Sequence, residues 1–392
     1  MAQYEVVVAG HLCLDILPGL ARGVSFTPGR SVAAGPATLA TGGAVANTGV
    51  ALHRLGVPAL LVGRVGDDLF GQAVRQIIGS RGPELTAGLV VAPGEQTSHT
   101  IVLSPPDADR MFIHHPGCNA AFTAADVTDE MLAQARLLHF GYPPTMARMS
   151  AEGGRELATL MRRAKLVGAG TSLDWTMIDP HGPAGLVDWR EVLAAALPHV
   201  DLFMPNIEEL LLALDRPTFE RMAAAPGGLV EAVTAELLAS VAGELIALGA
   251  GVVGLKIGHR GMYLRTAGAE RLSRMARAAP ADRLAWSDRE LWAPCFAVEV
   301  AGTTGAGDAT IAGFLMGLLR GFGPEDALIA ANAVGACSVE AADAVSGVRS
   351  WPETAERIAA GWPRRGLEPG SLGWRWDAGR QLWRGPNDGG GM

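Results

Sequence analysis

Cysteine is scarce in this sequence, and the few cysteines are isolated from one another. They are Cys13, Cys118, Cys295 and Cys337, and none of them belongs to a C-x-x-C pair. Structural zinc sites and disulfide frameworks need clustered or regularly spaced cysteines, so this distribution argues against both. We expect reduced thiols packed in the core.

Long apolar runs and basic clusters are missing as well. No uninterrupted apolar run reaches the ~18 residues of a membrane-spanning helix, and no basic region precedes the apolar run Val6–Val8. Acidic residues outnumber basic ones by 40 to 32, and no Lys/Arg-rich run is interleaved with aromatic residues. We therefore expect a soluble, cytoplasmic protein with neither nucleic acid nor membrane as its partner.

The sequence is rich in short apolar segments separated by turns. Apolar residues make up 49% of the 392 residues, and 51 residues are glycine. Repeated βα units predict an α/β fold, namely a doubly wound, mostly parallel sheet with helices on both faces. The expected strands cover 5–10, 59–63, 137–141, 170–174, 202–206 and 252–256, and the expected helices cover 44–56, 152–165, 188–197, 229–248 and 325–341.

Two segments break this alternation. Residues 18–41 are rich in Gly and Pro and show no helical period. Residues 100–103 and 110–114 are two β-rich runs separated by a short polar, Pro-containing segment, which is the pattern of a hairpin. We expect these segments to form a small accessory sheet.

One glycine-rich stretch, Gly302–Thr310, carries the strongest chemical signal. It follows Cys295–Val300, which predicts a buried strand, and precedes Ile311–Leu319, an apolar run of helical length. A tight turn that opens a helix directs several backbone N–H groups at one point, which favours an anion. Asp308 is the only ionisable residue in the turn, and the alternative is that it merely caps the helix.

Polar residues also follow other predicted strands. The carboxyl ends of parallel strands share one edge of a sheet, so such residues converge on a single crevice. With the Gly258–Gly261 loop, this arrangement would suit a polyphosphate. The sequence has no G-x-x-x-x-G-K-[ST] and no early G-x-G-x-x-G, which argues against a P-loop enzyme and a dinucleotide-binding protein. The polar residues are Asp15, Asp174, Asn206, Lys256 and Asp308.

Five motifs in a fixed order resemble those of the PfkB (ribokinase-like) family of sugar and nucleoside kinases. The resemblance covers roughly residues 4–350. It implies a kinase domain over 1–350, with a lid from about 18–41 and 97–115, and leaves 351–392 as a Trp-rich extension. The motifs are G-G-x-x-x-N at 42–47, G-x-x-G-x-D-x-x-G at 63–71, N-x-x-E at 206–209, the nucleotide loop at 256–261 and T-T-G-A-G-D at 303–308.

The resemblance also implies roles for individual residues. Asp308 would be the general base, and the amides of Gly305, Ala306 and Gly307 would bind the transferred phosphoryl group. Glu209 would orient Mg²⁺ with the help of Asn206. The sugar would be held by Asp15, Gly42, Gly43 and Asn47, and ATP by Asn206, Lys256, Gly258, Gly261, Thr304 and Asn332.

The activity implied is an ATP-dependent kinase that phosphorylates a hydroxymethyl group of a sugar or sugar-like substrate, of the ribokinase, fructokinase or 2-keto-3-deoxygluconate kinase type. A nucleoside kinase of the same fold and a non-catalytic sugar- or nucleotide-binding sensor are the alternatives. A homodimer through the lid is left open, because many relatives dimerise in this way.

Two features depart from the family pattern. Gly302 stands where many members have Asp, two residues before Thr304, and that region supports a monovalent-cation site in those enzymes. The missing carboxylate puts activation by K⁺ in doubt. The tail after residue 350 has no counterpart, and its tryptophans leave three states open: packing on the domain, packing on a partner subunit, or partial disorder.

Overall fold

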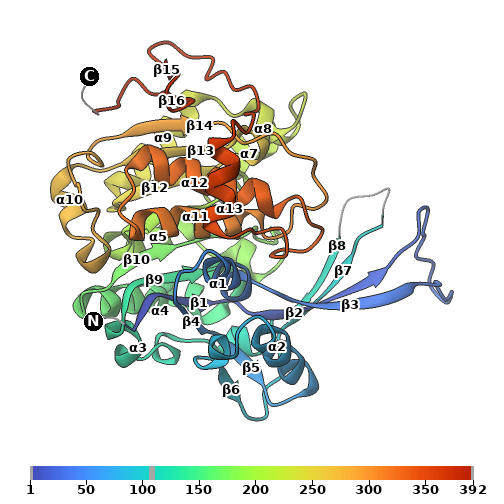
Figure 1. Cartoon of the computed structure of the whole chain (residues 1–392). Coiled ribbons are helices and arrows are strands. Elements are labelled where there is room, and N and C mark those ends of the chain that lie inside the picture. Colours follow the sequence, from blue (N-terminus) through green and yellow to red (C-terminus); the bar gives the residue numbers. More distant parts are fainter. Residues whose placement is uncertain (1–2, 106–110, 390–392) are drawn as a thin grey trace.

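A computed structural model describes residues 3–105 and 111–389 of the chain, and a large sheet runs through its centre (Figure 1). Within the described residues, ten strands pair in the order β15-β16-β14-β13-β12-β11-β10-β9-β1-β4. The strands from β12 to β4 are parallel to one another, and the others are antiparallel. The predicted α/β class with a mostly parallel sheet is confirmed. The parallel strands are β1 (Tyr4–Gly10), β4 (Ala59–Val62), β9 (Ala135–Gly141), β10 (Gly170–Leu173), β11 (Leu202–Phe203) and β12 (Val252–Lys256), and the antiparallel ones are β13 (Met262–Thr266), β14 (Glu290–Ala293), β15 (Arg375–Asp377) and β16 (Leu382–Arg384).

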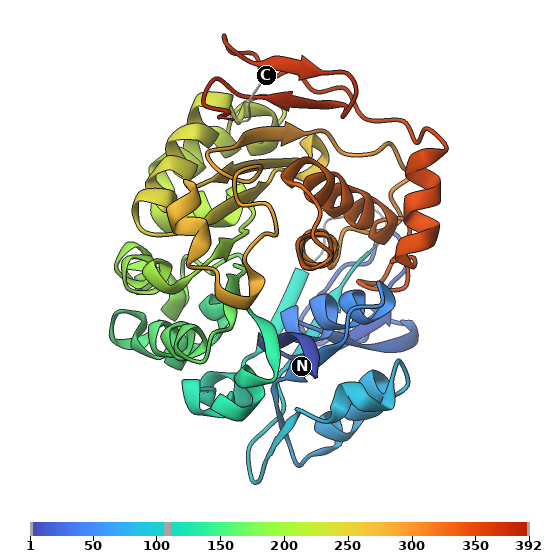
Figure 2. The ribbon, with the colours of Figure 1, turned by 60° about the vertical axis from the view of Figure 1, so that its left-hand side comes forward.

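Helices cover both faces of this sheet (Figure 2). Alternate residues of a strand point to opposite faces, so Val6 and Val8 of β1 enter one core while Val7 and Ala9 enter the other. The first core is completed by α1 (Ala44–Arg54), α2 (Leu69–Gly79), α10 (Ala269–Ser273), α11 (Ala306–Leu319) and α12 (Pro324–Ser338), and the second by α3 (Asp129–Ala133), α4 (Ala147–Leu166), α5 (Trp189–Ala196), α6 (Ile207–Leu214), α7 (Arg216–Ala223), α8 (Leu229–Ala232) and α9 (Ala235–Ala247).

The helix predicted over 229–248 is in fact two helices. Val233 takes an extended conformation after α8, and the Thr234 side chain caps α9 by accepting from the Leu237 N–H. A Thr at this position favours a helix start over a continuous helix. No helix in the described part of the chain is long and apolar enough to cross a membrane.

The accessory sheet projects from the body of the molecule (Figure 1). It has the order β3-β2-β7-β8, and β7 and β8 form the predicted antiparallel hairpin. Part of the hairpin's connection and Arg110, where its second strand was predicted to begin, lie outside the described residues. The strands are β2 (Cys13–Gly19), β3 (Gly35–Gly42), β7 (His99–Leu103) and β8 (Met111–His115); a separate pair is formed by β5 (Arg64–Gly66) and β6 (Val90–Ala92).

Asp15 lies in β2 of this accessory sheet and not at the carboxyl end of β1, where the sequence pattern had placed it. β1 ends at Gly10, whose φ of 126° is available to few residues other than glycine. The chain leaves the main sheet there and enters β2. In β2, Asp15 pairs with Ala40 of β3 on one side and with Thr100 of β7 on the other. The accessory sheet therefore starts at Cys13, earlier than predicted, and its role as a lid stays a prediction.

The strand predicted over Cys295–Val300 is also wrong. β14 ends at Ala293, directly before Pro294, which has no N–H to continue a ladder. Within the run, the pairing is a single bridge from Phe296 to Arg364, and Val300 is 57% exposed. The apolar side chains of this run line a cavity and do not fill a sheet interior.

The tail packs on the chain's own body. After α13 (Trp351–Ala359) it crosses towards the edge of the main sheet, where β16 pairs with β14 (Figure 2). Trp374 packs against Tyr263 and Trp292, with ring centroids 6.2 and 6.1 Å apart. The division of the chain at residue 350 stays a prediction.

A buried ion network fastens the tail. The Arg289 guanidinium contacts Asp388 through Nε and Glu325 through Nη2, each at 2.6 Å, and its side chain is 4% exposed. Arg384 also reaches Asp388, at 3.1 Å. The carboxyl group of Asp388 has a lowered pKa, because the hydrogen bond from Arg289 and the charge of its guanidinium outweigh burial, which raises it.

Arg289→Met should lower the free energy of unfolding by about 3 kcal/mol, because Asp388 and Glu325 lose their buried cation and are left with the more exposed Arg384. Urea denaturation would measure the change. Arg283→Met, at an exposed position, is the control and should change stability by less than about 0.5 kcal/mol. A loss below about 1 kcal/mol for Arg289→Met would show that the network does not hold the tail.

Candidate active site

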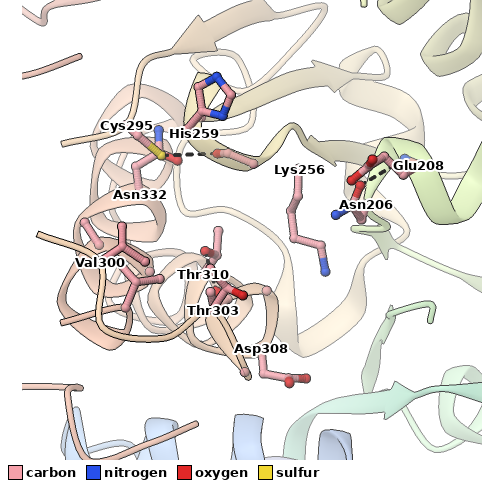
Figure 3. A pocket seen from close by; sticks show the side chains of 18 of the residues that line it. Asn206, Glu208, Lys256, His259, Cys295, Val300, Thr303, Asp308, Thr310 and Asn332 are labelled. Carbon is pink, nitrogen blue, oxygen red and sulfur yellow. Dashed lines mark hydrogen bonds between the residues drawn. The ribbon is translucent and has the colours of Figure 1, made fainter. Parts of the chain in front are cut away.

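A cavity of about 460 Å³ lies at the carboxyl ends of the parallel strands, against the start of α11 (Figure 3). It brings together residues that are far apart in the sequence, as the strand-end argument predicted. Of the predicted site residues, the cavity lining contains Asn206, Glu209, Lys256, Gly258, Gly261, Gly305, Ala306, Gly307, Asp308 and Asn332.

Asp308 is buried in the first turn of α11, with 2% of its surface exposed. It does not cap the helix, because the N-cap residue is Gly305. Side chains from other elements donate to its carboxylate instead. Asn47 Nδ2 and the Tyr142 hydroxyl donate to Oδ2 at 3.0 and 2.7 Å, and the Thr48 hydroxyl donates to Oδ1 at 3.2 Å.

These contacts leave the carboxylate able to accept one more hydrogen bond. A carboxylate has about four acceptor positions, two on each oxygen. Oδ2 receives two donors and Oδ1 one, so Oδ1 can still accept a hydroxyl. Burial raises the pKa of Asp308, and the hydrogen bonds from Tyr142, Asn47 and Thr48 together with the Lys256 ammonium lower it again in part.

Lys256 supplies the positive charge beside this carboxylate. It ends β12 and reaches into the cavity (Figure 3), where its Nζ lies 2.8 Å from Asp174 Oδ1. Burial alone would lower the pKa of Lys256, but the carboxyl groups of Asp174 and Glu209 raise it overall. The carboxyl groups around Lys256 thus favour the charged form of its ammonium.

The start of α11 has the geometry of an anion site. Gly305 takes a left-handed φ of 71°, and a Cβ atom there would lie 2.5 Å from the Ala344 methyl group. A Cβ on Gly307 would lie 3.2 Å from Lys256 Nζ, so the ammonium sits directly over the first turn. The Ala306 N–H donates weakly to Thr303 O at 3.3 Å. In an α-helix the first four N–H groups generally have no intrahelical acceptor, so such a turn can bind an anion.

Asn206 and Glu209 form a capping box at the start of α6. Asn206 Oδ1 accepts from the Glu208 N–H at 2.9 Å, and Glu209 Oε2 accepts from the Asn206 N–H at 3.2 Å. This contact uses one carboxyl oxygen of Glu209. Burial raises the pKa of Glu209 to about 8, and the nearby Asp174 adds to the effect.

The donor set fits Mg²⁺ but not an all-protein metal cage. Among the described residues, no three His, Cys, Asp or Glu side chains cluster so as to hold a metal ion. Mg²⁺ often takes only one or two carboxylates and completes its shell with waters and phosphates. Glu209, at the cavity wall, meets that need, and its metal role stays a prediction.

The predicted sugar-binding residues belong to the accessory sheet (Asp15 and Gly42) and to the start of α1 (Gly43 and Asn47), outside the cavity lining. Gly42 and Gly43 are required by close packing: a Cβ atom would lie 2.3 Å from Asp15 Oδ2 and 2.5 Å from His11 Nδ1, respectively. Burial raises the pKa of Asp15 to about 6. Asn47 bonds Asp308, and its Oδ1 is buried with no hydrogen-bond partner in the described structure.

Sequence reasoning missed Tyr142 and His11. Tyr142 directly follows β9 in a left-handed conformation, φ 67°, which is costly for such a residue and is often found at functional sites. His11 is 4% exposed, and neither ring nitrogen has a partner among the described residues. Burial lowers its pKa to about 3. Both residues directly follow strands of the main sheet, and that position was the available signal.

Of two further residues predicted to bind the nucleotide, one lines the cavity and the other does not. Asn332 lines the cavity and donates to Ala293 O at 2.9 Å, whereas the lining contains Thr303 and not Thr304. An Asp in place of Gly302 would put Cβ 2.8 Å from Ala342 O, so this backbone leaves little room for a side chain at that position. The doubt about activation by K⁺ stays a prediction.

Comparison with known proteins identifies relatives of this chain. Curated relatives include fructokinase-1 of Zea mays, 35% identical over 144 residues, which are 36% of this chain and 42% of that protein. Fructokinase-2 of Solanum lycopersicum is 30% identical over 139 residues, 35% of this chain and 40% of its own. The chain thus spans about two fifths of the length of these relatives.

Solved structures agree in fold over most of the chain. Arabidopsis thaliana ribokinase, complexed with ribose and ATP, superposes with a TM-score of 0.68 at 21% identity, covering 91% of this chain and 98% of that one. Xylella fastidiosa fructokinase with bound ATP gives 0.66 at 21% identity, with 91% and 98% covered. The model of the pfkB family of carbohydrate kinases matches residues 5–351. The chain belongs to the PfkB family of carbohydrate kinases.

Proposed function

We propose that this protein is an ATP-dependent kinase that phosphorylates a hydroxymethyl group of a sugar or sugar-like substrate. The observation that carries the proposal is the Asp308 carboxylate. It is buried at the start of α11 beside Lys256, and one acceptor position on Oδ1 is unfilled by the contacts described above. A pure binding protein has no need of a buried base in this position.

Phosphoryl transfer depends on positioning and on neutralising the charge of the transferred group. The acceptor hydroxyl would donate to Asp308 Oδ1 and lose its proton to that oxygen as it attacks. The first-turn amides of α11 and the Lys256 ammonium would stabilise the charge on the phosphoryl oxygens. Glu209 would help to hold Mg²⁺, which would supply further neutralisation of the phosphate charge.

The acceptor would lie between the lid and the body. Tyr142 connects the two sides, because its hydroxyl donates to Asp308 while its ring packs 6.1 Å from His11. His11 in turn packs 5.3 Å from His114 of β8. The two ring nitrogens of His11 and Asn47 Oδ1 offer the donors and acceptors that sugar hydroxyls need. The solved ribokinase complexed with ribose and ATP and the solved fructokinase with bound ATP support this class of ligand.

The direct test is coupled ADP release in the presence of Mg²⁺ across ribose, fructose, 2-keto-3-deoxygluconate, nucleosides and phosphosugars. We expect turnover with at least one sugar. Release with nucleosides alone would favour a nucleoside kinase. Tight sugar binding by calorimetry, without turnover for any acceptor, would favour a sensor and contradict the proposal.

Asp308→Asn should lower turnover by about 10²–10⁴-fold, because an amide cannot take the hydroxyl proton. Steady-state ADP release with the best acceptor measures it. Asp201→Asn is the matched control: Asp201 is a fully buried carboxylate paired with Lys165 and Arg271, outside the cavity. It should lose stability and keep its turnover per folded molecule. Near wild-type turnover for Asp308→Asn would eliminate Asp308 as the base.

Tyr142→Phe should move the acidic limb of the kcat–pH profile to higher pH by about one pH unit. The Tyr142 hydroxyl lowers the pKa of Asp308, so its loss raises that pKa, and the base then needs a higher pH to be ionised. Tyr263→Phe is the control, since Tyr263 donates to the buried carboxylate of Glu290 at 2.7 Å, away from the cavity. An unmoved limb for Tyr142→Phe would show that the group titrating is not Asp308.

A further inference from the structure

The tail contributes a wall to the cavity. After α13, the chain runs antiparallel to the segment that leads into the glycine-rich turn. The Ala297 N–H donates to Pro363 O, and the Arg365 N–H donates to Cys295 O, both at 2.8 Å. The family model matches only as far as residue 351, so this wall comes from a part of the chain outside that match.

Aromatic stacking fixes the position of this segment. Trp362 stacks on Phe296 with centroids 4.4 Å apart, and its Nε1 donates to Ala297 O at 2.9 Å. The Arg364 guanidinium lies over the same Phe296 ring at 3.8 Å and donates to Pro294 O at 3.0 Å. Phe296 itself lines the cavity. The Arg364 guanidinium is therefore held in place by its contacts with Phe296 and Pro294.

Arg365 is placed differently from its neighbour. Its main chain is fastened to Cys295, but its side chain is exposed, and no hydrogen bond or ion pair engages its guanidinium within the described structure. It lines the cavity of about 460 Å³ and also borders two adjoining hollows, each of which the tail helps to line. An exposed cation is thus held by its backbone at the mouth of the candidate nucleotide site.

The two ends of the cavity have different chemistry. Asp308 and Lys256 lie at one end, and Cys295 and Asn332 lie at the other (Figure 3). Phosphoryl transfer at Asp308 puts the phosphates of a nucleotide at the first end, which leaves its nucleoside part for the second. Arg365 is adjacent to that second end through its bond to Cys295.

We infer that Arg365 is a nucleotide-binding residue supplied by the tail, whose guanidinium contacts the nucleoside part of ATP. The inference rests on the proposed kinase function. A guanidinium presents five N–H donors and a flat face, so it can donate to ring nitrogens and ribose oxygens or stack on the base. Its neighbour His259 is paired with Glu231 at 2.6 Å, which leaves Arg365 as the unpaired cation at this end of the described cavity lining.

The test is calorimetric binding of Mg–ATP and of Mg–ADP to the full chain. Arg365→Ala should weaken both by about tenfold, the effect of losing one good charged contact. The loss should be equal for the two nucleotides, because they share the nucleoside. The KM for the sugar acceptor should not change, and Arg365→Lys should recover part of the affinity.

Arg375→Ala is the matched control, since Arg375 is an exposed arginine of the same tail and lies outside the cavity lining. It should bind both nucleotides like the wild type. Unchanged affinity in Arg365→Ala, with wild-type ATP binding intact, would overturn this inference alone. A loss confined to ATP would overturn the nucleoside assignment in favour of a phosphate contact. A wild-type chain that binds no ATP would overturn the proposed function as well.

Discussion

One buried carboxylate joins the separate parts of this molecule. Asp308 belongs to α11, yet its hydrogen bonds come from Asn47 and Thr48 of α1 and from Tyr142 after β9. A buried carboxylate without donors would be costly, so these elements have to keep their positions relative to α11. The same contacts that compensate for burial also position the group that our proposal makes the base.

The charge around this carboxylate is balanced within the cavity. Asp174, Glu209 and Asp308 surround a single ammonium, that of Lys256. Like charges at close range disfavour full ionisation, and burial raises the pKa of Asp308 and of Glu209. A site of this kind favours binding a cation together with a polyanion. The cation reduces the repulsion between the carboxylates and the polyanion, and the polyanion balances the added positive charge.

The parts that could be predicted from the sequence are those set by local residue types. The turn at 303–308 needs glycine where φ is positive, and Asn206 with Glu209 makes a capping box from residues three apart. Short apolar runs that end in Gly or a polar residue indicated the strands of the parallel sheet. Tyr142 could not be assigned a role in this way, because its contact with Asp308 depends on how β9 and α11 pack together.

Two errors have the same physical origin. Cys295–Val300 has strand-like residues, but Pro294 ends the ladder, and the tail pairs with the run at only one point. Asp15 follows a strand closely in sequence, but Gly10 diverts the chain into the accessory sheet before Asp15 is reached. In both cases, a single Pro or Gly beside the strand changed the path of the chain, and the apolar pattern of the run did not reveal it.

The pairing of β16 with β14 has a consequence for how the chain reaches its native state. β14 has hydrogen-bonding groups on the side that β16 occupies, and an uncovered strand edge invites pairing with other chains. β16 is made many residues after β14, so this edge waits uncovered during synthesis until the tail arrives. The Arg289–Asp388 contact then joins residues that are far apart in sequence and can form only at that point. Shortened chains that end before β16 would keep an unpaired edge on β14. In a cell, such chains would bind chaperones or associate with one another through that edge.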